Sequence, residues 1–343
     1  MGQTLTGLMA VEIAEKLGVK PFQGKQIFKW LHLKMVRDFD AMTDLSKALR
    51  ETLKENYEVR QLALVEMEQS ERTGTKKALL RLADGETVEC VLIRGADRIT
   101  LCLSSQVGCA LKCTFCATGL AGFTRDLTPD EIVEQALFLL EDEDMEGRTP
   151  NIVYMGMGEP LRNTENVIKS IKLLMDKNGL GIGARKISVS TAGELKGIRL
   201  FAQEDWQVRL SISLHAANDD LRSKLVPLNR KYSLEQLKET LLAYQADSGR
   251  QITFEWTLLD GVNDSKRDFD ELMEYRKGLK ASVNLIPWNP VADLPYGTSR
   301  PDKCEAFRDR LLEAGVQATL RVEKGRDIDA ACGQLRRTHA AVK

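Results

Sequence analysis

From about residue 128 onward, short apolar runs alternate with longer stretches in which apolar residues recur at helical spacing. The runs have the length of buried strands, and the stretches between them have the length of amphipathic helices. Six such repeats indicate parallel strands joined by right-handed crossovers. We therefore expect an α/β fold, an open, TIM-like (β/α)6 partial barrel with its function at the carboxyl ends of the strands. The sequence predicts strands over 151–155, 186–190, 208–213, 252–258, 283–286 and 318–322, and helices over 129–140, 164–176, 234–246 and 303–313.

Two smaller regions precede this barrel. Residues 1–60 have apolar positions at helical spacing and predict a small helical domain. Three short strand-like runs follow, separated by turns that contain glycine, and they predict an antiparallel β extension. These runs cover 78–82, 88–93 and 99–103. We therefore expect a helical accessory domain over 1–60, a β extension or linker over 61–104 and a barrel core over 105–343.

Length and composition exclude several classes of protein. With 343 residues, 43% of them hydrophobic and 29% charged, the chain can bury one large core and a small accessory domain. Neither a signal peptide nor an apolar run long enough to span a membrane occurs, so we expect a cytoplasmic protein with no membrane partner, and a monomer. Seven cysteines, three of them clustered, argue against a secreted disulfide framework and for metal or catalytic thiols.

One segment near the N-terminus is strongly basic. The net charge of the chain is −1, which neither requires nor excludes a nucleic-acid partner. Between residues 16 and 37, however, basic residues occur without a single acidic one and are interleaved with aromatic residues. This pattern fits a solvated helix face as well as a surface for phosphate groups. The basic residues are Lys16, Lys20, Lys25, Lys29, Lys34 and Arg37.

Three cysteines stand close together at the spacing C-x3-C-x2-C, namely Cys109, Cys113 and Cys116. Three thiolates so spaced can hold three irons of a [4Fe-4S] cube and leave the fourth iron open to a ligand. A structural zinc site needs a fourth cysteine or histidine, and the first histidine after Cys116 is the distant His215. The spacing therefore favours an iron-sulfur cluster over zinc, and it resembles the cluster motif of the radical S-adenosylmethionine (SAM) enzymes.

Polar groups follow four of the predicted strands. Gly158 would let a ligand approach the backbone, and the Glu159 carboxylate could pair with an ammonium group. Ser190 offers a hydroxyl at the next strand end, although serine also caps helices. His215 ends a third strand, where a histidine is more often structural than catalytic. Asn289 stands between two prolines, and its amide could pair with the edge of an adenine.

Five segments carry a closer resemblance. They are Cys102-Leu-Ser-Ser-Gln-Val-Gly-Cys109-Ala-Leu-Lys-Cys113-Thr-Phe-Cys116-Ala-Thr, Met155-Gly-Met-Gly-Glu159-Pro160, Ser213-Leu-His215-Ala, Asn284-Leu-Ile-Pro-Trp-Asn289-Pro and Ile328-Asp-Ala-Ala-Cys332-Gly-Gln-Leu. Together they resemble the RlmN family of dual-specificity RNA adenine C2-methyltransferases, within the radical SAM superfamily. The sister family, Cfr, methylates C8 of the same adenosine, typically has alanine after the glutamate of the glycine-rich turn and lacks the Pro-Trp pair. Pro160 and Pro287-Trp288 therefore favour RlmN.

The resemblance implies roles for three further residues. Cys332 would take a methyl group from one SAM, and a second SAM, cleaved at the cluster, would supply a radical that removes hydrogen from this S-methyl group. The methylene group would then add to adenine C2 and join protein to RNA. Glu89 would accept the C2 proton, and Cys102 would attack the sulfur of Cys332 and form a disulfide, which frees the product. Cys90 and Cys304 we expect to be structural.

The same resemblance implies cofactors, substrates and partners. These are a [4Fe-4S] cluster, SAM, adenosine 2503 of 23S rRNA, adenosine 37 of tRNA, and an electron donor such as flavodoxin. The helical domain would then bind RNA. Two other functions stay open, namely methylation at C8 and a cluster-bearing RNA-binding or redox-sensing protein without turnover. The implied SAM contacts are Gly158, Glu159, Ser190, Ser213, Leu214, His215 and Asn289.

Overall fold

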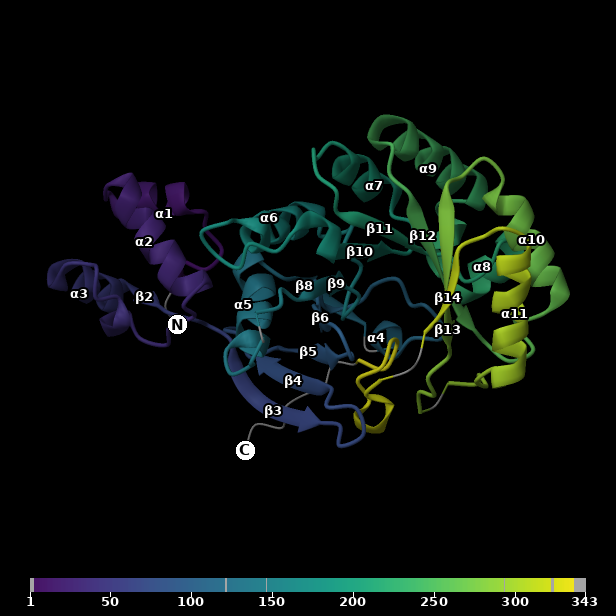
Figure 1. Ribbon diagram of the computed structural model, residues 1–343, viewed down its shortest axis with the longest axis horizontal. Helices are drawn as coiled ribbons and strands as arrows, with labels where there is room; N and C mark the ends of the chain where they lie inside the picture. The colour runs from purple at the N-terminus through teal and green to yellow at the C-terminus, as the bar shows by residue number, and fades with distance from the viewer. Residues whose placement is uncertain (1–2, 121, 146, 293, 322–323, 336–343) are drawn as a thin grey trace.

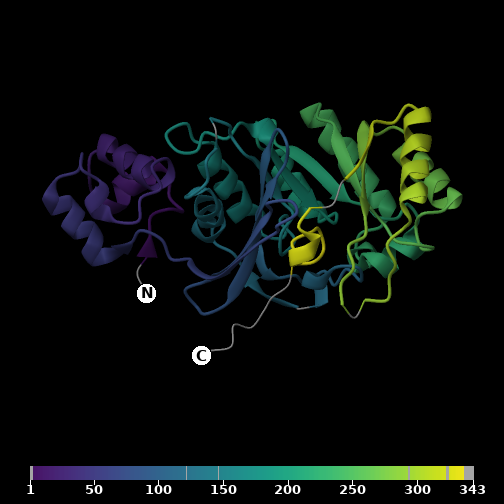
Figure 2. The ribbon, with the colours of Figure 1, turned by 60° about the horizontal axis from the view of Figure 1, so that its bottom comes forward.

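The computed structural model describes residues 3–120, 122–145, 147–292, 294–321 and 324–335. Helices from the N-terminal region form one end of an elongated molecule, and a long twisted sheet with flanking helices forms the rest (Figures 1 and 2). One hydrophobic cluster runs through both parts, since it includes Ile13 and Phe28 as well as Leu137 and Val189. No helix within the described ranges is both long and apolar enough to cross a membrane.

Ten strands form one sheet, in the order β14-β13-β12-β11-β10-β9-β6-β5-β4-β3. The strands from β6 to β14 are parallel, and β5, β4 and β3 continue the sheet in antiparallel fashion. The sheet strands are β3 (Ala63–Gln69), β4 (Lys76–Arg81), β5 (Thr87–Arg94), β6 (Ile99–Cys102), β9 (Asn151–Tyr154), β10 (Ile187–Thr191), β11 (Arg209–Ser213), β12 (Ile252–Leu258), β13 (Ala281–Pro287) and β14 (Ala318–Leu320). Two short pairs join β1 (Gln3–Thr4) to β2 (Tyr57–Glu58), and β7 (Gln106–Gly108) to β8 (Phe123–Asp126).

Helices connect the parallel strands and lie along the outside of the curved sheet (Figure 1). The carboxyl ends of the parallel strands therefore meet at one edge of the sheet. The α-helices are α1 (Ala10–Leu17), α2 (Pro21–His32), α3 (Lys47–Asn56), α4 (Ala117–Leu120), α5 (Pro129–Leu140), α6 (Thr164–Met175), α7 (Leu195–Ala202), α8 (Asp219–Leu225), α9 (Leu234–Ser248), α10 (Lys266–Arg276) and α11 (Pro301–Glu313). Single 3-10 turns are η1 (Phe39–Ala41), η2 (Ala184–Lys186), η3 (Pro227–Arg230) and η4 (Arg326–Ile328).

The α/β class and the parallel barrel strands are confirmed. α5 and β12 have the predicted bounds, and the other predicted barrel elements differ from the structure by one or two residues at their ends. The last predicted strand reached residue 322, which lies outside the described residues. β3 was not predicted, because its apolar alternation is confined to Val65-Glu66-Met67-Glu68 and nearly all its side chains are exposed.

The antiparallel strands are continuous with the barrel. β6 pairs with β5 on one side and, in parallel, with β9 on the other, so the sheet passes without a break from the extension into the barrel. β6 therefore serves as the first barrel strand as well as the last strand of the extension. The division of the chain near residue 104 stays a prediction.

The two N-terminal helices approach each other closely at a glycine. A Cβ atom at Gly24 of α2 would come within 2.3 Å of the carbonyl oxygen of Ala10 in α1. α2 begins at Pro21. A proline is tolerated in the first helical turn, because the backbone N–H that it lacks would have no partner within the helix there. Lys25 and Lys29 lie one turn apart on α2 and are exposed.

After β14 the chain leaves the sheet. We call residues 324–335 the C-terminal segment. It first contacts the antiparallel strands, where the Ser70 hydroxyl donates to Asp327 over 2.9 Å. It then reaches α4, where the amide of Ala117 donates to the carbonyl oxygen of Gly333 over 2.8 Å. Figure 1 shows this yellow segment beside α4, so the C-terminal segment lies against the loop that holds the three clustered cysteines.

Candidate active site

The three clustered cysteines lie in one loop between β7 and α4. The amide of Cys109 donates to the carbonyl oxygen of Gly122 over 2.6 Å. The amide of Cys116 donates to the carbonyl oxygen of Cys113 over 3.2 Å. Burial raises the pKa of the Cys109 thiol to about 12 and raises that of Cys113 as well. Iron binds the deprotonated thiolate, so cluster binding must be favourable enough to remove the protons from these thiols.

A cavity of about 160 Å³ lies beside this loop, at the carboxyl ends of the parallel strands. We call it the thiol cavity. It contains nine of the thirteen residues that the sequence singled out. Those nine are Cys109, Cys113, Cys116, Gly158, Glu159, Ser190, Ser213, His215 and Cys332.

The turn after β9 faces the cavity with a glycine and a buried carboxylate. Gly158 has a φ of 105°, and a Cβ there would lie 2.6 Å from the Cβ of Gln106, so only glycine fits. Glu159 is 3% exposed and accepts from the amides of Leu161 and Ala192 over 3.0 and 2.8 Å. Burial raises the pKa of Glu159, and these hydrogen bonds oppose that rise.

The ends of β10 and β11 bring two hydroxyls and an imidazole to the cavity. The hydroxyl oxygens of Ser190 and Ser213 lie 3.2 Å apart. His215 has a left-handed backbone, and its Nδ1 accepts from the amide of Thr257 over 3.0 Å. Burial lowers its pKa to about 3, so it is a neutral imidazole. The Leu214 side chain, in contrast, is buried in the core, and only its backbone lies at this strand end.

Asn289 does not line the cavity but lies just beyond it and is 2% exposed. Its Nδ2 donates to the carbonyl oxygen of Cys332 over 3.1 Å. Its Oδ1 is buried and accepts no hydrogen bond from the described residues. A buried acceptor without a donor is unusual, and it fits a site whose ligand supplies the missing N–H.

Cys332 and Cys102 lie near enough to each other to interact electrostatically. Cys332 is exposed to the thiol cavity, whereas Cys102 on β6 is 7% exposed. Burial raises the pKa of Cys102 to about 12, and the nearby Cys332 adds to this rise. All seven cysteines of the chain fall within the described ranges, and none forms a disulfide. Cys90 and Cys304 are buried, as expected for structural thiols.

Glu89 lies on the same face of the sheet as Cys102. In the antiparallel register Val91 is opposite Cys102, and side chains alternate along β5, so Glu89 and Cys102 share a face while Cys90 faces the other way. Glu89 is 5% exposed and lies 3.7 Å from Lys77. It does not line the thiol cavity itself.

Sequence reasoning missed two charged residues of the site. Arg321, directly after β14, points Nη1 at the sulfur of Cys332 over 3.8 Å. Glu255 on β12 lines the cavity, and its Oε1 lies 3.7 Å from Nη2 of Arg321. A glutamate as the only charged residue of the predicted strand 252–258 was the available signal, because a buried carboxylate needs a partner.

The residues present fit a cluster with an open iron and a bound SAM. Three thiols, a carboxylate, two hydroxyls and a neutral imidazole surround one cavity, and the unpaired Oδ1 of Asn289 lies beside it. Within the described ranges no three cysteine, histidine or acidic side chains lie close enough to bind a single metal ion. A cube separates its thiolates further, because each binds a different iron, whereas a lone zinc ion would need them together.

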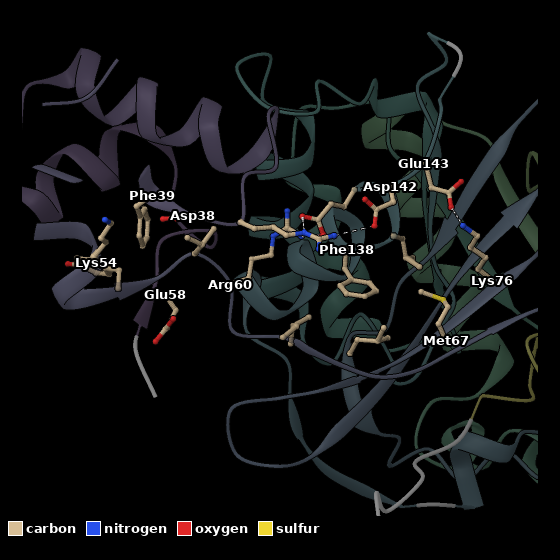
Figure 3. A pocket seen from close by; sticks show the side chains of 17 residues that line it. Asp38, Phe39, Lys54, Glu58, Arg60, Met67, Lys76, Phe138, Asp142 and Glu143 are labelled. Carbon is tan, nitrogen blue, oxygen red and sulfur yellow. Dashed lines mark hydrogen bonds and ion pairs between the residues drawn. The ribbon is translucent and has the colours of Figure 1, made fainter. Parts of the chain in front are cut away.

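A larger cavity, of about 700 Å³, lies between the N-terminal helices and the sheet (Figure 3). We call it the charged cavity. Several of its charges are paired: Arg60 lies 3.3 Å from Glu141, and Glu143 contacts Lys76 as well as Arg94, which lies outside the lining. None of the residues that line it is a cysteine. Its paired charges join the N-terminal region to the rest of the fold.

Comparison with known proteins shows the family to which the chain belongs. The radical SAM superfamily matches residues 103–275, and the ribosomal RNA large subunit methyltransferase N-terminal domain matches residues 6–59. The dual-specificity RNA methyltransferase RlmN of Halorhodospira halophila is 47% identical, over 94% of this chain and 89% of its own. The RlmN of Magnetococcus marinus is 45% identical, over 97% of this chain and 94% of its own. A solved radical SAM methyltransferase from Sphaerobacter thermophilus is 43% identical and superposes with a TM-score of 0.93, over 97% of this chain and 99% of that chain. The chain therefore belongs to the RlmN family of radical SAM RNA methyltransferases.

Proposed function

We propose that the protein methylates C2 of adenosine in RNA through an S-methylcysteine at Cys332. The substrates are adenosine 2503 of 23S rRNA and adenosine 37 of tRNA. The observation that carries the proposal is that Cys332 lines the same cavity as Cys109, Cys113 and Cys116, although more than two hundred residues separate them in the chain. The proposed reaction needs the methyl-accepting thiol and the cluster close together, because a radical formed at the cluster must reach the methyl group on that thiol. A shared cavity meets this need.

Cys109, Cys113 and Cys116 hold the cluster in this proposal, and a [4Fe-4S] cluster with bound SAM supplies the radical that activates a methyl group. The chain's own residues bind and orient the cosubstrate. Gly158 and Glu159 receive its amino group, and the remaining contacts divide between its carboxylate, ribose and adenine. Those remaining contacts are Ser190, Ser213, Leu214, His215 and Asn289.

Cys332, Cys102 and Glu89 carry the covalent steps. Cys332 accepts the methyl group as a thiolate and then becomes bonded through that carbon to adenine C2. Glu89 accepts the C2 proton. The Cys102 thiolate attacks the sulfur of Cys332, so the disulfide forms while the electron pair of the carbon-sulfur bond passes to the methylene carbon. That carbon takes up a proton and becomes the methyl group of the product, and a reductant restores both thiols. The shared sheet face of Glu89 and Cys102 supports this division of roles.

The N-terminal region supplies phosphate contacts. Lys25, Lys29 and Lys34 are exposed, whereas Arg37 is already paired with Glu141. Phosphate contacts position an RNA whose target base must leave its stack to reach the thiol cavity. We further propose a cytoplasmic monomer that takes electrons from a donor such as flavodoxin.

The test is anaerobic reconstitution with iron and sulfide, followed by incubation with SAM, a reductant and either 23S rRNA or tRNA. Mass spectrometry of the digested nucleosides identifies the product. We expect 2-methyladenosine together with 5'-deoxyadenosine. 8-Methyladenosine would instead assign the chain to C8 chemistry, and an intact cluster without methylated adenosine would indicate a binding or redox-sensing role.

A further inference from the structure

One guanidinium lies directly against the reacting sulfur. Arg321 follows β14, and its side chain is 34% exposed. Its Nη1 lies 3.8 Å from Sγ of Cys332, and its Nη2 lies 3.8 Å from Sδ of Met155. These are distances at which an N–H donates to sulfur, so Arg321 places a positive charge in direct contact with the Cys332 thiol.

Glu255 and Asn284 hold this guanidinium in place. Oε1 of Glu255 lies 3.7 Å from Nη2 of Arg321, and its Oε2 accepts from Nδ2 of Asn284 over 2.7 Å. Glu255 is 3% exposed on β12, and Asn284 lies opposite it on the neighbouring β13. The chain of contacts therefore runs from Asn284 on β13 through Glu255 on β12 to Arg321 after β14. It restricts the orientations that the Arg321 side chain can adopt.

We propose that Arg321 is a catalytic residue that stabilises the thiolate of Cys332, with Glu255 as its positioning residue. The inference rests on the proposed role of Cys332 as methyl acceptor. The thiol proton first leaves to water. An electron pair of the thiolate then forms the bond to the methyl carbon, while the sulfonium-methyl bond breaks and leaves its electron pair on the departing thioether. A thiolate is the nucleophile in such a displacement, so its population sets the rate.

The charged and titratable groups around the thiol act in opposite directions. Although Cys332 is exposed to the thiol cavity, the surrounding protein desolvates its thiol and raises its pKa. Glu255 and Cys116 add to that rise, whereas Arg321 lowers the pKa. Arg321 also opposes the raised pKa of Cys102. Once Cys332 is bonded to carbon it has no charge to stabilise, and the same guanidinium then favours the thiolate of Cys102 that attacks it. One cation thus serves the two thiols in turn.

The test measures the thiol directly. The cluster-loaded enzyme, reduced and kept under anaerobic conditions without SAM or RNA, is treated with iodoacetamide between pH 6 and 10, and peptide mass spectrometry follows the labelling of Cys332. Iodoacetamide is uncharged, so its own attraction to Arg321 does not enter. We expect R321Q to raise the midpoint of the labelling profile by about one pH unit, which makes labelling about tenfold slower below the midpoint. R321K keeps the charge, so most of the rate should return.

Two controls separate charge from damage. R267Q removes an exposed arginine on α10 and should leave the profile unchanged. Cys90 and Cys304 are buried and should stay unlabelled in every variant that keeps its fold. E255Q keeps an amide oxygen that can still accept a hydrogen bond from Arg321, and it removes the opposing negative charge. The midpoint should therefore move downward, whereas a general loosening of the site would not lower it.

Three results would overturn the proposal. They are an unchanged profile in R321Q with Cys90 and Cys304 protected, an R321K variant as slow as R321Q, and an E255Q midpoint that stays or rises. If R321Q exposes the buried cysteines, E255Q and R321K decide the question alone. Because neither SAM nor RNA is present, these outcomes are independent of the nucleoside analysis, which tests the proposed function itself.

Discussion

The two cavities of this protein differ in a way that size does not capture. The charged cavity is more than four times larger than the thiol cavity, at about 700 against 160 Å³. In the large one, ion pairs such as those of Arg60 with Glu141 and Lys76 with Glu143 satisfy the charges from within. Beside the small one, Oδ1 of Asn289 has no donor among the described residues and three cysteine thiols share one loop.

This difference separates a structural contact from a site of chemistry. Groups that already satisfy one another stabilise the fold and have little left to offer a ligand. Groups that are buried without a partner cost stability, and a bound ligand offsets that cost. We therefore expect substitutions in the thiol cavity to change activity with little effect on stability, and substitutions in the charged cavity to do the reverse.

The largest expected effect is that of C332A. It removes the proposed nucleophile, so 2-methyladenosine should fall below detection, while the urea midpoint of unfolding should stay close to that of the parent protein. C304A, at a buried cysteine in α11, is the matched control, because it should lower stability and retain methylation. Normal product formation by C332A would end the proposal that this thiol carries the methyl group.

A smaller effect is expected from N289A. If Oδ1 of Asn289 accepts a hydrogen bond from the cosubstrate, its loss costs about 1 to 2 kcal/mol of binding, or roughly a tenfold rise in the dissociation constant for SAM. Equilibrium binding to the cluster-loaded enzyme measures this. N166A, at a partly buried asparagine on α6, serves as the control. Equal SAM affinity in N289A and the parent protein would remove Asn289 from the binding site.

In the charged cavity, R60M should reverse the pattern. The side chains of Arg60 and Glu141 are each only 12% exposed, so the substitution leaves a largely buried carboxylate with one partner fewer. We expect a loss of about 2 kcal/mol in the free energy of unfolding, with unchanged methylation at temperatures where the variant is folded. Lost activity at unchanged stability would show that this cavity, too, takes part in function.

The subtlest effect lies outside both cavities. Replacing Lys25, Lys29 and Lys34 with glutamine should weaken RNA binding and reduce the slope of log affinity against log salt by about one unit for each phosphate group that is no longer neutralised. The control replaces three exposed lysines in or shortly after α10, namely Lys266, Lys277 and Lys280. Figure 1 shows α10 at the opposite end of the molecule from α2. Equal salt slopes in both triple variants would exclude the N-terminal lysines as phosphate-binding residues.

Local patterns in the chain predicted most of the fold and part of the site. The parallel strands could be found because each is a compact apolar run, and the cluster loop because its cysteines are neighbours in sequence. β3 could not be found in this way, because nearly all its side chains are exposed and it has no compact apolar run. Arg321 and Glu255 could not either, because a charge within or beside a strand gives no sign of which distant sulfur it will meet. The role assigned to Glu89 stays a prediction.

The C-terminal segment adds no strand to the sheet, yet it carries Cys332. One reactive thiol is therefore supplied by a stretch of chain that lies outside the sheet, whereas Cys102 and Glu255 lie on its strands. A truncation before residue 324 would leave every strand pair of the described residues in place and still take away the thiol that we propose as methyl acceptor. Such a shortened protein would be a folded scaffold with an intact cluster loop, able to compete for RNA and SAM without completing the reaction.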